Sequence, residues 1–554
     1  MAFPRSISSA LSLLLLTLLH HPSPISASYA FYIGSAHTSS GGVLVGGTGE
    51  EVSSHWLQLF PAADHNTTNT TITVGVTPDA ILPGHLLQIP QVPHTFRYLS
   101  MEYSDFEGFP APLTNGGVNE RSVAVRDVWA ENRAELYAMT PDPQTGLQYS
   151  DLARRVLERA GSAREGVEII ADLVERYGYA DYGGNSHLIA DADEGWVVWE
   201  FAGGQKLWAA ERLGPNDIRV LYPGYIEDFP LDYNSNSSSS SSSSKDYMGA
   251  PHLIDFAVEQ GWWDPSSGDP FNIFQIYGVQ GENYTARDGG FKYMSQAALE
   301  EAALAKAPVT EADLMALVRD PRIADDEAGY GQVVALRHDT ADADLIRVWN
   351  APTGSVAAPF VPWWLGVTSI PPEFGQHRYL TTGASGTFLN PDFQLQEAAA
   401  FAGRLYKRVL YYMCTAPDAY LPVVTDMLAG FEAQSRDDVD GWVEKAAGAL
   451  LLGKEKGGRE AARKLLTYYS GARAEADMRL GGVLVDALDG YVKLKGLWRS
   501  PTGDQINDAG EGAETVNCLV GFDPDQPPEK QNRSSSRRKR AGAADASWLK
   551  GFEL

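Results

Sequence analysis

The stretch SYAFYIGSAHTSSGGVLVGGTGEE, residues 28–51, lies directly behind a predicted secretory leader. Two short apolar runs, residues 29–33 and 42–45, flank a turn rich in glycine and serine, which predicts a hairpin or two strands of one sheet. Ahead of it, residues 1–27 contain Arg5, the apolar run LSLLLLTLL and the small-residue exit PSPISA. These are the parts of a signal peptide, and the apolar run is too short to span a bilayer. We therefore predict a secreted, extracellular protein that is cleaved after Ala27.

Cleavage at that point makes Ser28 the first residue of the mature chain, so that one residue carries a hydroxyl and a free α-amine. Because such an amine has a pKa of roughly 7.7–8.0 in peptides, a useful fraction is neutral near neutral pH and can accept the hydroxyl proton. Ser28 is thus a candidate nucleophile with its own base. Cleavage after Ala30, which also has the small-x-small pattern, would remove this candidate.

Composition excludes several classes of partner. The chain has 554 residues, a formal net charge of -27 and a pI of about 4.8, which argues against nucleic-acid binding. No metal or nucleotide motif is present, so no cofactor is expected. No stretch after the leader is long and apolar enough to suggest a membrane partner. Cys414 and Cys518 allow one disulfide, although sequence alone does not establish their pairing. Glycosylation is predicted at the sequons Asn66, Asn69, Asn236, Asn283 and Asn532.

Hydrophobic periodicity predicts a mixed α+β protein. Residues 149–177 read as two helices, the second opened by a capping box at Ser162, and residues 186–213 read as three strands joined by turns. FVPWWLGV, residues 360–367, is predicted to be an apolar loop. The predicted organisation is a signal peptide at 1–27, a body at 28–390 with a disordered Ser-rich insertion near 234–245, a helical region at 391–500 and a polar, partly disordered tail at 523–554.

Several of these stretches occur in an order that resembles the dipeptidase–secernin family of N-terminal-nucleophile peptidases. They are YAFYIG, GGTGEEVSSHW, NGGVNE and YGGNSHLIADADEGWVVWEFAGG. The resemblance implies an αββα N-terminal-nucleophile hydrolase sandwich, in which two sheets lie between helices. It also implies hydrolysis of short peptides through an acyl-enzyme, without a cofactor. Ser28 stands where the family typically has cysteine, and the arginine of the family's Ala-Arg-Asn-Glu-Asp-Ser segment is absent from residues 46–51.

The resemblance also suggests roles for single residues. Asn119, in Gly-Gly-Val-Asn-Glu, matches the family's Gly-x-Asn-Glu turn and would donate to the oxyanion. Glu50 would hold the α-ammonium of Ser28 or bind the amino group of the substrate. Asn185 and His187 begin a predicted strand and are candidates for lining the substrate pocket.

Two other functions remain open from sequence. The chain can be a family member that keeps the fold as a binding protein and has lost the chemistry. It can also be a carbohydrate-active secreted protein, because 13 Trp and many acidic residues suit sugar stacking and paired carboxylates. No carboxylate pair stands out by motif.

Overall fold

The hairpin predicted behind the leader is present in the computed structural model. Strand β1 (Tyr29–Ile33) pairs antiparallel with β2 (Val43–Thr48), with Tyr29 opposite Thr48. The structure describes residues 28–49, 55–66, 70–104, 108–233, 245–280, 295–322, 324, 328–376, 399–414, 416–453 and 456–494.

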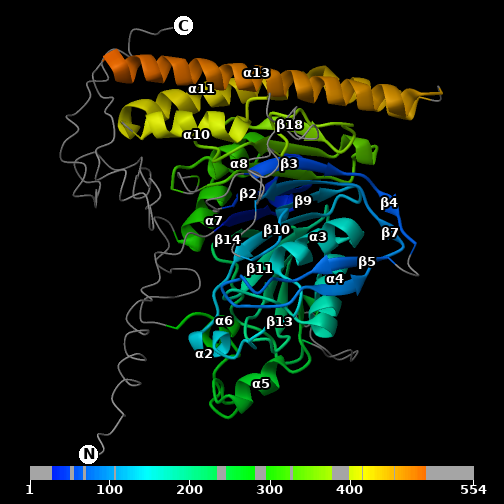
Figure 1. Cartoon of the computed structure of the whole chain (residues 1–554), viewed down its shortest axis with the longest axis vertical. Helices are drawn as coiled ribbons and strands as arrows, with labels where there is room; N and C mark the ends of the chain where they lie inside the picture. Colours follow the sequence, from blue (N-terminus) through cyan, green and yellow to red (C-terminus); the bar gives the residue numbers. More distant parts are fainter. Residues whose placement is uncertain are drawn as a thin grey trace, which may run out of the picture.

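Two antiparallel sheets lie at the centre of the fold (Figure 1). The six-stranded sheet consists, in spatial order, of β14 (Ile218–Leu221), β1, β2, β16 (Gly331–Leu336), β17 (Arg347–Ala351) and β18 (Val361–Trp364). The eight-stranded sheet consists of β15 (Tyr247–Gly249), β13 (Trp208–Leu213), β12 (Gly195–Glu200), β11 (Asn185–Ala190), β10 (Ala124–Trp129), β9 (Leu113–Asn119), β8 (Tyr98–Tyr103) and β3 (His55–Phe60). Two small sheets add β4 (Ala63–Asp64) with β7 (His94–Thr95), and β5 (Thr71–Val74) with β6 (Leu87–Pro90).

Side-chain alternation along the strands accounts for the layers. In β1, Ala30 and Tyr32 join a core shared with the eight-stranded sheet, whereas Phe31 and Ile33 join a core shared with helices. Helices α3 (Tyr149–Arg159) and α4 (Ala163–Tyr177) pack on the eight-stranded sheet. The order is therefore helix, sheet, sheet, helix.

The helices that cover the six-stranded sheet come from two parts of the chain. They are α7 (Gln296–Leu304), α8 (Glu311–Val318), α10 (Ala402–Met413), α11 (Pro417–Asp438), α12 (Glu444–Leu452), which follows a π-helical turn at Val439–Val443, and α13 (Gly458–Leu494). Three short helices, α2 (Ala134–Tyr137), α5 (Leu253–Glu259) and α6 (Ile273–Tyr277), lie at the opposite end of the molecule (Figure 1). The C-terminal helices thus form an outer layer of the sandwich, since α13 packs directly on β18.

The prediction of a mixed α+β fold is confirmed, but one element differs. FVPWWLGV, predicted to be a loop, contains strand β18, which pairs with β17. Proline is compatible with this strand because β18 lies at the edge of the sheet, where a missing backbone N–H need not break a ladder.

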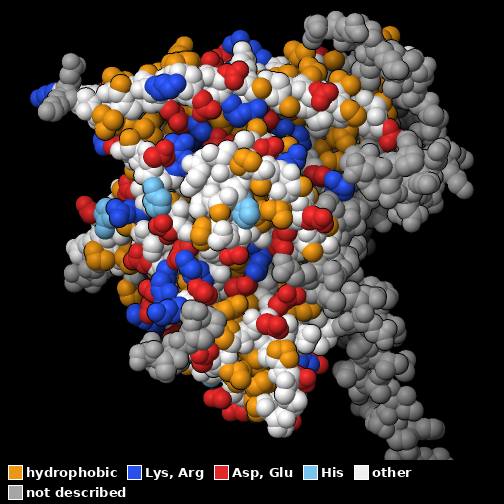
Figure 2. All heavy atoms as spheres, turned by 180° about the vertical axis from the view of Figure 1, so that it is seen from behind, with side chains coloured by type: hydrophobic (Ala, Val, Ile, Leu, Met, Phe, Trp, Pro, Cys, Tyr) orange, Lys and Arg blue, Asp and Glu red, His pale blue; other side chains and the backbone are white. Residues whose placement is uncertain are grey.

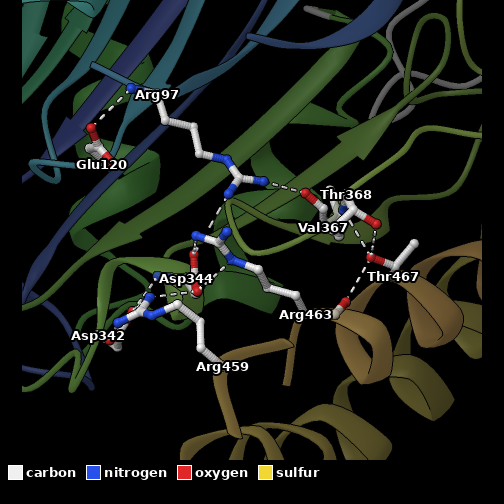
Figure 3. A network of polar contacts seen from close by, with 9 residues as sticks. All are labelled: Arg97, Glu120, Asp342, Asp344, Val367, Thr368, Arg459, Arg463 and Thr467. Carbon is white, nitrogen blue, oxygen red and sulfur yellow. Dashed lines mark hydrogen bonds and ion pairs between the residues drawn. The ribbon is translucent and has the colours of Figure 1, made fainter. Parts of the chain in front are cut away.

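Charged side chains bind the C-terminal layer to the sandwich. Asp344 accepts a bidentate contact from Arg463 of α13, with Nε–Oδ2 at 2.8 Å and Nη2–Oδ1 at 2.9 Å (Figure 3). Arg459 donates to the same carboxylate at 2.7 Å, and Arg97, just before β8, approaches it at 3.8 Å. The carboxylate of Asp344, which lies between β16 and β17, therefore contacts arginines from α13 and from the segment before β8, and so links α13 to both sheets.

The surface combines both signs of charge. Figure 2 shows acidic and basic side chains interspersed over the sandwich and apolar side chains along the helical layer. The exposed large apolar residues of the C-terminal helices and the π-helical turn between them are Tyr411, Val423, Met427, Trp442, Leu450, Leu452, Tyr468, Val483 and Leu494. Within the described part of the chain, no helix has the length and apolar character that crossing a membrane requires.

Candidate active site

Ser28 lies immediately before β1 and is 8% exposed. Because side chains alternate along an extended chain, Ser28 shares a face with Ala30 and Tyr32, which lie in the core between the sheets. The hydroxyl of the candidate nucleophile is therefore directed into the layer between the two sheets.

The strands beside Ser28 define its neighbours. The register of β1 with β2, continued by one residue, sets Ser28 beside Gly49, and the register of β2 with β16 sets Tyr330 on the other side of Gly49. The carbonyl of Gly49 accepts a hydrogen bond from the N–H of Gly329 at 2.7 Å. Ser28, Gly49 and Tyr330 thus form one row across three chain segments.

Gly329 permits the approach of a buried histidine to this row. A Cβ at Gly329 would lie 2.0 Å from Cε1 of His55, so only glycine fits here. The His55 ring packs between Tyr103 and Tyr330, with ring centroids 5.3 Å and 5.4 Å away. His55, at the start of β3, is therefore held against the segment that pairs with Gly49.

A buried hydrogen-bond chain fixes the orientation of His55. Asn115 Nδ2 donates to Asp127 Oδ1 at 3.3 Å, and Asn115 Oδ1 lies 2.8 Å from His55 Nε2. Because an amide oxygen only accepts, Nε2 of His55 must carry the proton in this contact. The sequence analysis named none of His55, Asn115 and Asp127 as site residues. The charged pair Arg126-Asp127 inside the apolar strand AVRDVW is a signal that could have pointed to Asp127.

His187 is buried on the helix-covered face of the eight-stranded sheet, where it pairs with Asp127. Its Nδ1 lies 2.8 Å from Glu200 Oε1, and its Nε2 lies 3.1 Å from the carbonyl oxygen of Tyr149 in α3. Burial lowers the pKa of His187, but the charge and hydrogen bond of Glu200 outweigh it, so the pKa is raised overall. The ring therefore forms an ion pair beneath α3, turned away from the layer that contains Ser28.

Asn185 shares the face of His187. It lies opposite Glu200 in the β11–β12 register, and its Nδ2 donates to the carbonyl of Ser186 at 3.1 Å. Ser186, between Asn185 and His187 in sequence, faces inward. Gly224 approaches it so closely that a Cβ there would lie 1.7 Å from the Ser186 Oγ. Of the predicted strand-start residues, neither Asn185 nor His187 shares the inner face with Ser28.

Asn119 lies at the far end of the sandwich. Its Nδ2 donates to the carbonyls of Leu157 and Ala160 at 3.1 Å and 2.8 Å, and its Oδ1 accepts from the N–H groups of Arg121 and Val123 at 2.9 Å and 3.1 Å. Both amide hydrogens are consumed, so the side chain clamps the β9–β10 turn to the end of α3. It has no N–H left for an oxyanion.

The strand registers show the separation of Asn119 from Ser28. The ring of Tyr32 packs on Gly195, which pairs with Ala190, and Ala190 pairs with Ala124 beside the Asn119 turn. Asn119 therefore lies at the Tyr32 end of β1, roughly four residues or 13 Å along the strand from Ser28. The predicted role of Asn119 as an oxyanion donor is therefore wrong.

Acidic groups also collect beneath the helices. Asp181 and Glu200 are fully buried. Burial raises the pKa of the nearby buried Tyr179 hydroxyl, and the negative charges of Glu200 and Asp181 raise it further. Asp181 accepts from the N–H of Gly183 at 2.9 Å, while its Oδ2 has no partner among the described residues. Burial raises the pKa of Asp181 to about 7.

This pKa predicts a pH dependence of stability. An aspartate has a pKa of about 3.9 in the unfolded chain, so ionisation of Asp181 opposes folding as the pH rises from about 4 to about 7. Asp181→Asn mimics the protonated acid and should remove this effect, making the variant more stable than wild type by up to about 4 kcal/mol at pH 8 and no different at pH 4. Urea unfolding at both pH values measures the difference. A constant difference between the two proteins across this range would contradict the prediction.

Several sequence predictions fall outside the described residues. They are Glu50, Cys518, the sequons at Asn69, Asn236, Asn283 and Asn532, the Ser-rich insertion, and the leader and tail. Asn66 is described and exposed, as a glycosylation site requires. Glycosylation stays a prediction, and the pairing of Cys414 with Cys518 stays open.

Comparison with known proteins links the central part of the chain to peptidases. Residues 86–299 match the model of peptidase family C69. A probable dipeptidase of Salmonella dublin is 27% identical over 184 residues, which are 33% of this chain and 39% of that protein. A probable dipeptidase of Latilactobacillus sakei is 28% identical over 204 residues, which are 35% of this chain and 38% of that protein. The chain thus spans less than half the length of these relatives.

Solved structures are more distant. A mutant of conjugated bile acid hydrolase from Clostridium perfringens is 10% identical, with a TM-score of 0.27 and coverage of 58% of this chain and 88% of that one. A second variant of that hydrolase gives a TM-score of 0.26. Scores this low do not bear on the fold.

The family match contains β8–β13, and therefore Asn115, Arg126, Asp127 and His187, whereas Ser28 and the hairpin of β1 and β2 lie outside it. Residues 86–299 are thus similar to peptidase family C69, and this similarity, with the two probable dipeptidases, supports the dipeptidase-type resemblance predicted from the sequence.

Proposed function

We propose that the protein is a secreted dipeptidase that hydrolyses the amide bond of short peptides with Ser28 as an N-terminal nucleophile. The observation that carries the proposal is the position of Ser28: it precedes β1 directly, faces the layer between the sheets, and lies opposite the sheet that holds most of the family match. The helix, sheet, sheet, helix order supports the N-terminal-nucleophile hydrolase fold.

In the proposed reaction, the neutral α-amine of Ser28 accepts the hydroxyl proton while the oxygen attacks the peptide carbonyl. The carbon–nitrogen bond then breaks, and the ammonium returns the proton to the leaving amine. Water attacks the resulting ester, with the α-amine again acting as base, and releases the acid. Since the free amine is required, kcat/KM should rise with pH up to a plateau above about 8.

The first test is the N-terminus of the secreted protein, determined by mass spectrometry and followed by dipeptide turnover. A mature chain that starts at Ser28 with a free amine and releases amino acids from dipeptides is the expected result. A start beyond Ser28, or a blocked amine, would exclude this mechanism. The chain would then be better described as a family member that keeps the fold as a binding protein.

A further inference from the structure

Arg126 is a buried cation that forms no ion pair with a carboxylate in the described part of the chain. It lies in β10 and is 1% exposed. Its Nη1 donates to the carbonyl of Val125 at 2.8 Å and reaches that of Gly117 at 3.5 Å. Its Nε and Nη2 have no hydrogen-bond partner among the described residues. Half of the guanidinium is thus anchored, and the other half is unsatisfied.

The two unsatisfied atoms form one edge of the guanidinium. Nε and Nη2 present parallel N–H groups along the side of the plane, and this edge binds a carboxylate through two hydrogen bonds. The anchored Nη1 lies outside that edge, so the anchor fixes the group without occupying the fork. The free edge therefore has the geometry of a carboxylate receptor.

Arg126 lies on the Ser28 side of the eight-stranded sheet. Its neighbour Asp127 pairs with His187 on the helix-covered face, so Arg126 points the other way, toward the six-stranded sheet. Burial lowers the pKa of Arg126 there, and Tyr330, which stands in the same row as Ser28, and then Asp127 oppose this shift. Strand β1 itself packs against β10 and β11 across this layer.

The energetic cost of such a group also points to an anion. An ionised group removed from water without a partner is strongly unfavourable, and arginine cannot escape by losing its proton. Burial lowers the pKa of Arg126, but the guanidinium stays charged near neutral pH. A buried arginine therefore needs an anion to balance its charge, and a bound substrate carboxylate is one source of it.

We propose that Arg126 binds the free C-terminal carboxylate of the substrate and so restricts the enzyme to short peptides with an unmodified C-terminus. The inference rests on the proposed dipeptidase function and adds its specificity determinant. Arg126 would then supply, from the facing sheet, the cation that residues 46–51 lack.

The test compares a dipeptide with the same dipeptide as its C-terminal amide. Wild type should prefer the free acid in kcat/KM by about 10- to 100-fold, as expected for hydrogen bonds to a charged group. Arg126→Met should reduce this ratio to near one, mainly through a higher KM for the acid. Arg126→Lys keeps the charge without the fork and should give an intermediate ratio. An unchanged ratio in Arg126→Met would overturn the proposal.

Arg121→Met is the matched control, because Arg121 is exposed in the turn of the same β9–β10 hairpin. It should keep the wild-type ratio. Thermal melting separates specificity from folding: Arg126→Met should melt at or above the wild-type temperature, since it removes an unpaired buried charge. A lower melting temperature together with an unchanged ratio would assign Arg126 a purely structural role.

If wild type hydrolyses neither peptide, the proposed function fails but Arg126 can still be tested. Thermal melting with a free amino acid and with its amide then reports binding directly. A rise in melting temperature with the acid alone, lost in Arg126→Met, would support the carboxylate site. No rise in wild type would overturn it.

Discussion

Ser28→Ala should lower kcat/KM for dipeptides by about 10⁴-fold or more, because removing a nucleophile leaves only binding and electrostatic contributions. The side chain faces the layer between the sheets and is replaced by a smaller one, so the fold should be retained. Turnover should be measured on secreted variant protein that mass spectrometry has shown to begin at position 28.

Two companion variants make this result specific. Ser28→Cys should stay active, since a thiol is the nucleophile typical of the family that the sequence resembles. Ser39→Ala changes an exposed serine in the turn between β1 and β2 and should behave as wild type. Retention of activity in Ser28→Ala would show that the nucleophile is another residue, whatever the N-terminus of the mature chain.

Asp344→Ala should lower the free energy of unfolding by about 3 kcal/mol or more. The side chain of Asp344 is 4% exposed and holds Arg463, Arg459 and Arg97 together (Figure 3). Removing this carboxylate leaves Arg97, whose side chain is 12% exposed, without this acidic partner. The cost exceeds that of a surface ion pair because water cannot fully replace the lost contact.

Chemical denaturation measured by circular dichroism tests this prediction. Asp339→Ala is the control, because Asp339 forms an ion pair with Arg337 at 2.8 Å but is 75% exposed. Its effect should stay within about 0.5 kcal/mol. Equal effects of the two substitutions would mean that the Asp344 contacts contribute no more than an exposed pair.

Local sequence patterns predicted many elements correctly. The β1–β2 hairpin, the helix pair α3 and α4, and the strands β11–β13 all appear near their expected positions. The Ser162 side chain accepts from the N–H of Glu165 at 3.2 Å, as expected at a helix start. Each of these signals depends on residues a few positions apart, so no knowledge of the tertiary structure was needed.

The site was predicted less well, since it depends on which faces meet. Asn119 matched a family motif but is saturated by carbonyls at the end of α3. Asn185 and His187 were assigned to the correct strand but lie on its helix-covered face. A strand pattern identifies two alternating faces, and it does not show which of them faces the other sheet.

The sequence by itself determined much of the chain's secondary structure and its likeness to a peptidase family, because these are encoded in short patterns and in the order of motifs. Only the tertiary structure decided which polar groups find partners. Asp127 reaches Asn115 on the neighbouring strand, whereas Arg126, the adjacent residue, enters the layer between the sheets and keeps an open fork among the residues described there. The physical reason is that hydrogen bonding and desolvation depend on groups brought together from distant parts of the chain, which no local pattern records.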